Sequence, residues 1–153
     1  MTADAEKKTG VLTDDGVKSD FIPAIAVFHC RWCQPDSDQV RDMLPDDVVD
    51  KAVIGRLNCS ARMEAEFAIK AFGEGYDGVL VIGCEFGECH YRVGNVQASR
   101  RLDLLRRILA LAGIHPERLG VLWVNPFDED TTRGWIERYV WRLKKTGPFK
   151  EQK

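Results

Sequence analysis

Long apolar segments are missing from the chain, and so is an excess of charge of either sign. No run approaches the roughly 20 apolar residues that a helix needs to cross a bilayer. The 153 residues carry 22 Lys and Arg against 24 Asp and Glu, a net charge of −2. Nothing in this balance indicates a general nucleic-acid binder, which needs a basic surface, so we expect no nucleic-acid partner. The first residues show no apolar stretch behind a basic start, so we expect no secretory signal, no membrane insertion and a cytoplasmic protein.

Cysteine is absent from the first 29 residues and from everything after residue 89. In a reducing compartment, cysteines serve as ligands or redox centres more often than as structural disulfides. A single cysteine is commonly no more than a small buried hydrophobe, so any function has to be read from where all of them fall. The five that occur are Cys30, Cys33, Cys59, Cys84 and Cys89.

Short apolar runs alternate with helical patterns between two polar tails. We expect flexible tails at residues 1–21 and 147–153 and a single α/β domain at 22–146. The apolar runs predict strands at 22–28, 52–57, 78–82 and 119–124. The helical patterns predict helices at 37–44, 61–72, 95–112 and 131–143, with Asp36, Ser60 and Asn95 as the first three caps. Continuous apolar strands joined by helices predict a three-layer α/β sandwich. Its four-stranded parallel sheet would have the flavodoxin-like order 2-1-3-4.

All five cysteines follow the ends of predicted strands. Cys30 and Cys33 come after the first strand, Cys59 after the second, and Cys84 and Cys89 after the third. In an open α/β sheet, ligands bind at this edge, in the crevice where the strand order reverses. With the order 2-1-3-4, that crevice lies between the first and third strands. The pattern therefore predicts that the thiols share one ligand.

Several chemistries use thiols in such patterns. The Cys30–Cys33 pair is typical of a thiol–disulfide oxidoreductase, which would leave three thiols without a role. A structural zinc ion takes four ligands, although a domain of this length needs no metal to fold. A cysteine nucleophile activated by His29 or His90 would again leave most thiols idle. An iron–sulfur cluster also takes four thiolates.

The residues around the cysteines suit a negatively charged cluster. Gly83, Gly87 and Gly94 let backbone N–H groups approach sulfur closely, and the helix expected to start at Asn95 points its positive end inward. A flavin is disfavoured, because the loop HCRWCQP after the first strand lacks the small residues that a phosphate needs. Arginines flank the cysteines at Arg31, Arg56, Arg62 and Arg92.

Three blocks of the sequence carry a resemblance to a known family. They are FHCRWC at 28–33, RLNCSAR at 56–62 and GCEFGECHYRVGN at 83–95. The third matches G-C-x-x-G-x-C-H-Y-x-x-G-N at every fixed position. Over residues 24–145 the chain resembles the delta-subunit family of methyl-viologen-reducing hydrogenase. It departs from that family in QPDS at 34–37 and NPF at 125–127, both at the predicted functional edge.

The resemblance implies an electron-transfer subunit with one 2Fe-2S cluster, rather than an enzyme in its own right. In that family the subunit passes electrons between a hydrogenase or formate dehydrogenase and the flavin-containing A subunit of heterodisulfide reductase. Four of the five thiols are then expected to bind iron. We rank Cys30, Cys33, Cys84 and Cys89 first because they flank the predicted crevice. Cys59 is the expected spare, or it replaces Cys30 or Cys33.

Aromatic residues near the cysteines are expected to serve the cluster and its partners. Trp32, His90 and Tyr91 lie among the ligands, where they would shield the cluster and donate hydrogen bonds to it. Trp135 and Trp141 on the last predicted helix, together with the polar N-terminal tail, are candidate docking elements.

Overall fold

Four parallel strands form the central layer of the computed structural model, which describes residues 20–34 and 36–149. The strands are β1 (Ile25–Cys30), β2 (Ala52–Leu57), β3 (Gly78–Cys84) and β4 (Leu119–Val124). They lie in the order β2-β1-β3-β4, and every neighbouring pair is parallel. The predicted α/β fold and its strand order are therefore confirmed. Residues 1–19 of the predicted N-terminal tail lie outside the described residues.

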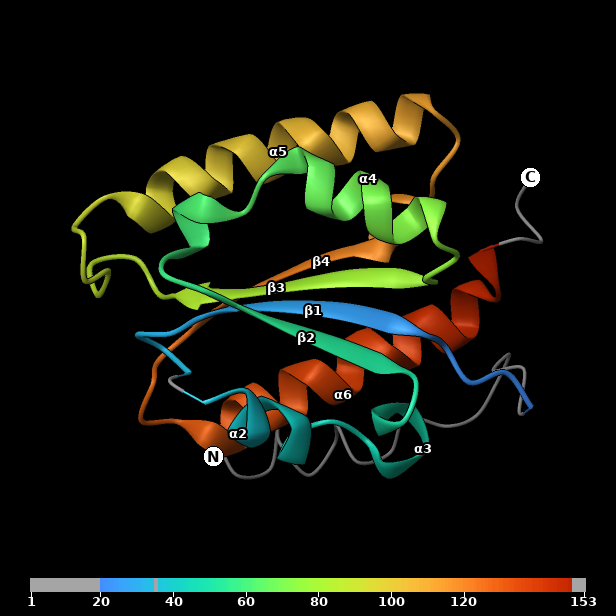
Figure 1. Ribbon diagram of the computed structural model, residues 1–153, viewed down its shortest axis with the longest axis horizontal. Helices are drawn as coiled ribbons and strands as arrows, with labels where there is room; N and C mark the ends of the chain where they lie inside the picture. Colours follow the sequence, from blue (N-terminus) through green and yellow to red (C-terminus); the bar gives the residue numbers. More distant parts are fainter. Residues whose placement is uncertain (1–19, 35, 150–153) are drawn as a thin grey trace, which may run out of the picture.

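Helices cover both faces of the sheet (Figure 1). One face carries α4 (Ala65–Gly73) and α5 (Gly94–Leu111), and the other carries α2 (Ser37–Asp42), α3 (Asp46–Val49) and α6 (Glu129–Thr146). Two short 3-10 turns, η2 (Ser60–Arg62) and η3 (Pro116–Arg118), precede α4 and β4. Within the described residues, no helix is both long enough and apolar enough to span a membrane.

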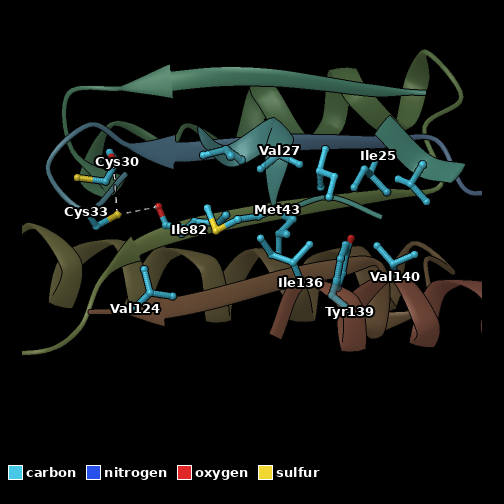
Figure 2. Packing of buried hydrophobic residues seen from close by; sticks show 14 of the residues in the cluster. Ile25, Val27, Cys30, Cys33, Met43, Ile82, Val124, Ile136, Tyr139 and Val140 are labelled. Atoms are coloured by element: carbon cyan, nitrogen blue, oxygen red, sulfur yellow. Dashed lines mark hydrogen bonds between the residues drawn. The ribbon is translucent and has the colours of Figure 1, made fainter. Parts of the chain in front are cut away.

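The apolar strands are buried because both sheet faces are covered. All seven residues of β3 are buried, and its side chains alternate between two apolar clusters. Figure 2 shows one cluster, in which Ile25 and Val27 of β1 face Ile136 and Val140 of α6. Cys30 and Cys33 lie at the end of this same cluster, so the thiols are continuous with the hydrophobic core.

Two strands differ from their predicted bounds in a way that affects the thiols. The first strand was expected at 22–28, but β1 runs from Ile25 to Cys30, where Cys30 pairs with Leu57 of β2. The third was expected to end at Ile82, but β3 continues to Cys84, which pairs with Val124 of β4. The last residues of these strands were hard to recognise in the sequence, because they include the polar His29 and two cysteines. Ladder pairing therefore holds the backbone of Cys30 and Cys84 on the rigid sheet.

The helix predicted at 61–72 is wrong as a single element. The chain forms the turn η2, becomes extended at Met63, and starts α4 only at Ala65. This break places the Met63 side chain in the core at 3% exposure. The predicted Ser60 cap is also wrong, because the N–H of Ala61 donates to the Cys59 sulfur, 3.5 Å away.

The observed caps test the other predicted helix starts. Asp36 caps α2 as predicted, since its carboxylate accepts from the Asp38 N–H at 2.9 Å. The last helix was expected at 131–143, but α6 is longer at both ends, and Asp128 caps it by accepting from the Thr131 N–H. Asn95 is not a cap, because α5 begins one residue earlier, at Gly94.

The end of the sheet opposite the thiols is tied together by a buried hydrogen-bond network. Arg118 is fully buried and donates to the carbonyls of Asp77 and Gly147. The Tyr139 hydroxyl lies 3.0 Å from the Val79 carbonyl oxygen and 2.8 Å from that of Arg118. Residues 147–149, the described part of the predicted C-terminal tail, pack against the domain through this network and the Phe149 ring.

Candidate metal centre

All five cysteines lie at the carboxyl edge of the sheet, at three neighbouring strand ends. Cys30 and Cys84 are the last residues of β1 and β3. Cys33 is in the turn after β1, Cys59 directly precedes η2, and Cys89 is in the loop between β3 and α5. Four are buried, and Cys89 is partly exposed. The parallel strands thus bring together residues that are up to 59 positions apart in the chain.

Three thiols form a compact group between β1 and β3. The sulfur atoms of Cys30, Cys33 and Cys84 all lie within 4.8 Å of one another. The sulfurs of Cys30 and Cys84 are 3.8 Å apart. The Cys33 sulfur is 3.4 Å from the Cys30 carbonyl oxygen and 3.8 Å from that of Ile82 (Figure 2).

The other two thiols converge on the first turn of α5. A methyl group added at Gly94 would lie 2.4 Å from the Cys59 sulfur and 3.2 Å from the Cys89 sulfur. Both thiols therefore face the same point, at a position where only glycine leaves them room. The N-terminus of a helix carries partial positive charge, which stabilises thiolates beside it. A cavity of about 340 Å³, lined in part by Cys59, Gly94, Arg62 and Tyr91, opens here.

Backbone N–H groups point at two of the sulfurs. The N–H of Trp32 donates to the Cys30 sulfur at 3.4 Å, and the N–H of Ala61 donates to the Cys59 sulfur at 3.5 Å. Hydrogen bonds of this kind stabilise thiolates and tune metal–sulfur centres. They also show that Cys30 and Cys59, from different strand ends, have matching local surroundings.

The thiols between β1 and β3 influence one another's protonation. Hydrogen bonds from the thiols of Cys33 and Cys84 lower the pKa of Cys30. The contact with Cys30 raises the pKa of Cys33, as does burial, and raises the pKa of Cys84 to about 12. Burial, and then the neighbouring Cys89, raise the pKa of Cys59. The three thiols of the compact group are therefore close enough to change one another's protonation.

His29 holds the loop that follows β1. Its Nδ1 lies 2.7 Å from the Gln34 carbonyl oxygen and its Nε2 2.9 Å from the Ser37 hydroxyl. A carbonyl only accepts, so Nδ1 carries the proton and Nε2 accepts from Ser37. Burial lowers the pKa of His29, which favours this neutral form. With both ring nitrogens engaged, His29 is placed to position the Cys30–Cys33 turn, not to activate a thiol.

Asn95 has a role that its sequence pattern does not reveal. Its side chain is fully buried, and its amide nitrogen donates to the carbonyls of Cys84 and Glu85, each at 2.9 Å. It therefore ties the end of β3 to the start of α5. From the sequence, the position of Asn95 directly after a glycine predicted only a helix cap. It did not predict these hydrogen bonds to the end of β3.

The predicted shielding aromatics form a stack on the surface of the thiol edge. The rings of Trp32 and His90 lie 3.5 Å apart at 11°, and Tyr91 meets His90 edge-on. Arg31 lies over the Trp32 ring at 5.5 Å. Trp32 and Tyr91 are about half exposed, so the stack forms part of the outer surface. Hydrogen bonds from these side chains to a cluster stay a prediction.

The donor set fits a thiolate-bound metal centre. Five buried or partly buried sulfurs, with N–H donors and a helix N-terminus beside them, provide soft ligands and stabilise their charge. The space that a Cβ at Gly94 would fill is left open between two of these sulfurs. Oxygen-seeking cations such as magnesium are disfavoured by this set.

Comparison with known proteins decides the family. The family described as methyl-viologen-reducing hydrogenase, delta subunit, matches residues 25–147. The chain belongs to this family. The three cysteine blocks that carry the resemblance all lie within the matched region, so the family predicted from the sequence is confirmed.

Relatives of two kinds are similar to this chain. The iron-sulfur D subunit of the F420-non-reducing hydrogenase of Archaeoglobus profundus is 33% identical over 134 residues, which cover 88% of this chain and 98% of that protein. The A subunit of the ferredoxin/F420H2-dependent CoB-CoM heterodisulfide reductase of Methanosarcina acetivorans is 35% identical over 127 residues, which cover 83% of this chain. The chain spans only 16% of the length of that larger relative.

The two loops expected to depart from the delta-subunit family follow β1 and β4, at the same edge of the sheet as the thiols. In the first loop, Gln34 is buried and its amide nitrogen has no hydrogen-bond partner among the described residues. In the second, Asn125 donates to the Glu85 carboxylate, and Phe127 is 96% exposed. Residues of both loops therefore contribute to the surroundings of the thiol edge.

Proposed function

We propose that the chain is a cytoplasmic electron-transfer subunit carrying one 2Fe-2S cluster at the thiol edge. It relays electrons between a hydrogenase or formate dehydrogenase-type module and the flavin-containing A subunit of a heterodisulfide reductase-like complex. The observation that carries this proposal is the meeting of five cysteine sulfurs at three strand ends, next to the first turn of α5.

The relatives support both halves of this proposal. Several are named as the iron-sulfur D subunit of a hydrogenase, which agrees with a sulfur-ligated cofactor. Others are named as the A subunit of a heterodisulfide reductase, in which the region similar to this chain is one part of a longer polypeptide. We infer that this chain works beside a protein of that kind.

The residues of the edge suit an electron carrier. A bound cluster supplies a site that accepts and releases one electron at a time. The thiolates would hold its iron, while the Trp32 and Ala61 N–H groups and the start of α5 offset its negative charge. Exposures of 2% for Cys30 and 3% for Cys84 keep water away on the sheet side. Cys89 and the loop around it lie nearer the surface, where a partner's cofactor can approach.

Aromatic surface residues supply candidate docking contacts. Trp135 on α6 is 44% exposed and stacks with Arg138, an arrangement common at protein interfaces. The partly buried ring of Trp141 lies under Lys145, and its indole nitrogen has no partner among the described residues. We propose these α6 residues, with the Trp32–His90 stack, as contacts for the two partner modules.

Anaerobic isolation of the tagged chain from its native host tests the relay. The expected result is a coloured preparation that retains flavin-containing or hydrogenase-like subunits and is bleached by a one-electron reductant. Recovery of the chain alone, as a colourless monomer, would contradict the proposal. A thiol–disulfide oxidoreductase using Cys30 and Cys33 would instead reduce insulin disulfides as metal-free protein, and we expect no such activity.

A further inference from the structure

Helix α5 carries a second row of apolar side chains on the side that faces away from the core. Its inward side packs against the sheet through a separate set of residues, namely Ala98, Leu102, Leu105 and Leu109. Leu104, Ile108 and Leu111 are instead 58%, 51% and 90% exposed. Spacings of four and three residues place these three on one side of a helix, as a continuous stripe. A helix that only covers a sheet needs one apolar side, so the outer stripe is suited to a separate partner.

Two arginines run along one flank of this outer stripe. Arg100 and Arg107 are both exposed, and neither forms an ion pair with another described residue. They are seven residues apart, which is two helical turns or about 10 Å along the helix axis. Their positive charge is therefore available to carboxylates of another molecule.

The other charges beside the stripe are already paired. Arg101 lies on the opposite flank, where it donates to the Ala61 carbonyl and forms an ion pair with Glu64 at the start of α4. Asp103, the acidic residue of α5, lies 3.8 Å from the Arg106 guanidinium. Among the described residues, the unpaired charge beside the stripe is thus positive and confined to one flank. This asymmetry sets the orientation in which a partner can bind.

We propose that Leu104, Ile108 and Leu111, with Arg100 and Arg107 beside them, bind an amphipathic helix of another polypeptide. The partner helix has apolar side chains at the same spacing of three and four residues, which interdigitate with the stripe. It also has two acidic residues seven positions apart on one flank, which meet the two arginines. Opposite charges placed beside an apolar seam select the partner and its orientation.

A second copy of this chain fits the stripe less well. In an antiparallel pair of α5 helices, the flank that bears Arg100 and Arg107 would meet the same flank of the other copy. In a parallel pair it would meet the flank that bears Arg101. Both arrangements bring positive charges together, and like charges across an interface disfavour binding.

A membrane surface also fits less well. Helices that lie in the bilayer interface combine a wide apolar side, often with aromatic residues, with many cations on the polar side. The outer stripe is a narrow row of aliphatic side chains, and α5 contains no Trp, Phe or Tyr. Its size and shape match the seam of a second helix instead.

The stripe lies at a distance from the thiol edge. Gly94, which faces the sulfurs of Cys59 and Cys89, is ten residues before Leu104, or about 15 Å along the helix. A partner bound to the stripe therefore leaves the thiol edge accessible. The inference goes beyond the proposed relay and does not depend on a cluster, because apolar packing and charge pairing need no metal.

Site-specific photocrosslinking in the native host tests this inference. The full chain carries p-benzoylphenylalanine in place of Leu104 or, separately, of Leu111. Val53, 46% exposed on β2 at the edge of the sheet, is the matched control position. After irradiation, the cross-linked peptides are sequenced by mass spectrometry. We expect both stripe positions to join one amphipathic segment of another polypeptide, with Asp or Glu seven residues apart, and Val53 not to join it.

Charge reversal tests the role of the arginines. Combining Arg100→Glu with Arg107→Glu should lower the yield of the Leu111 cross-link several-fold. Replacing the two acidic residues of the identified segment by arginine should restore the yield. The melting temperature of the isolated variant, followed by circular dichroism, should stay at the wild-type value, because both side chains are exposed.

Four outcomes would overturn the inference. They are cross-links from the stripe to a second copy of the chain, cross-links to lipid, cross-links to a segment without the acidic spacing, and no cross-link at all. A yield that charge reversal leaves unchanged would likewise remove the arginines from the interface. A wild-type chain that gives the expected cross-link but contains no iron and sulfide would overturn the proposed function alone, which separates the two failures.

Discussion

Replacing Gly94 with alanine tests how closely the start of α5 is shaped around the thiols. The new methyl group would lie 2.4 Å from the Cys59 sulfur and 3.2 Å from that of Cys89. Non-bonded heavy atoms normally approach to about 3.5–4.0 Å, so the Cys59 sulfur has to move by about 1 Å or more. In the metal-free chain the thiol can rotate away cheaply. With iron bound, a ligating sulfur at this point cannot move away, because the metal fixes its position.

Gly94→Ala should therefore separate cluster binding from folding. The metal-free variant should unfold within about 1 kcal/mol of wild type, because alanine favours the helix by up to about that amount. Its iron and sulfide content after anaerobic reconstitution should fall to a small fraction of the wild-type value. Gly134→Ala in α6 is the matched control, since no atom lies within 4 Å of the added methyl group and the cluster should be unaffected. Full iron content and an unchanged spectrum in Gly94→Ala would refute this reasoning.

Substitutions at three further positions probe the site and the opposite end of the sheet. Asn95→Ala removes the donor to one buried and one partly buried carbonyl, so we expect about 2–3 kcal/mol lower stability in urea melts and weaker iron retention. Asn95→Asp should not rescue it, and a rescue would contradict the donor role. Tyr139→Phe should lower stability by about 1–2 kcal/mol at the far end of the sheet with iron content unchanged, and an equal loss of iron would argue against two independent regions. Trp32→Ala should release iron to a chelator several-fold faster, whereas an unchanged rate would remove Trp32 from the shield.

The strand order and the gathering of cysteines at one edge follow directly from sequence pattern. Continuous apolar strands separated by helices permit few arrangements, and parallel strands bring their carboxyl ends together wherever the loops go. Cys59 and Cys84 could therefore be placed at the same edge although helix α4 separates them in the chain. The family pattern around the third strand added the prediction of a 2Fe-2S cluster.

The direction of each thiol could not be predicted in this way. Cys30 and Cys33 are three residues apart and their sulfurs both lie near that of Cys84, but the Cys33 sulfur also lies 3.8 Å from the Ile82 carbonyl oxygen in the core. That difference depends on the extension of β1 to Cys30 and on the turn held by His29. Spacing in a sequence does not encode such local geometry.

Helix starts were also hard to predict from the sequence, because one residue type serves two purposes. Asn95 is a residue type that often caps helices, but here it makes hydrogen bonds to the end of β3. Cys59 is a residue type that often binds metals, and here its sulfur also accepts the Ala61 N–H at the start of η2. For Asn95, contacts with a separate element that are invisible in the sequence decided the role of the side chain.

Iron and labile-sulfide analysis of the anaerobically purified chain, combined with paramagnetic resonance before and after reduction, tests the central claim most directly. The account predicts two iron and two sulfide atoms per chain. It also predicts a spectrum that is silent when oxidised and shows a single spin-one-half centre when reduced. One zinc ion per chain, with no sulfide and no reducible centre, would contradict it.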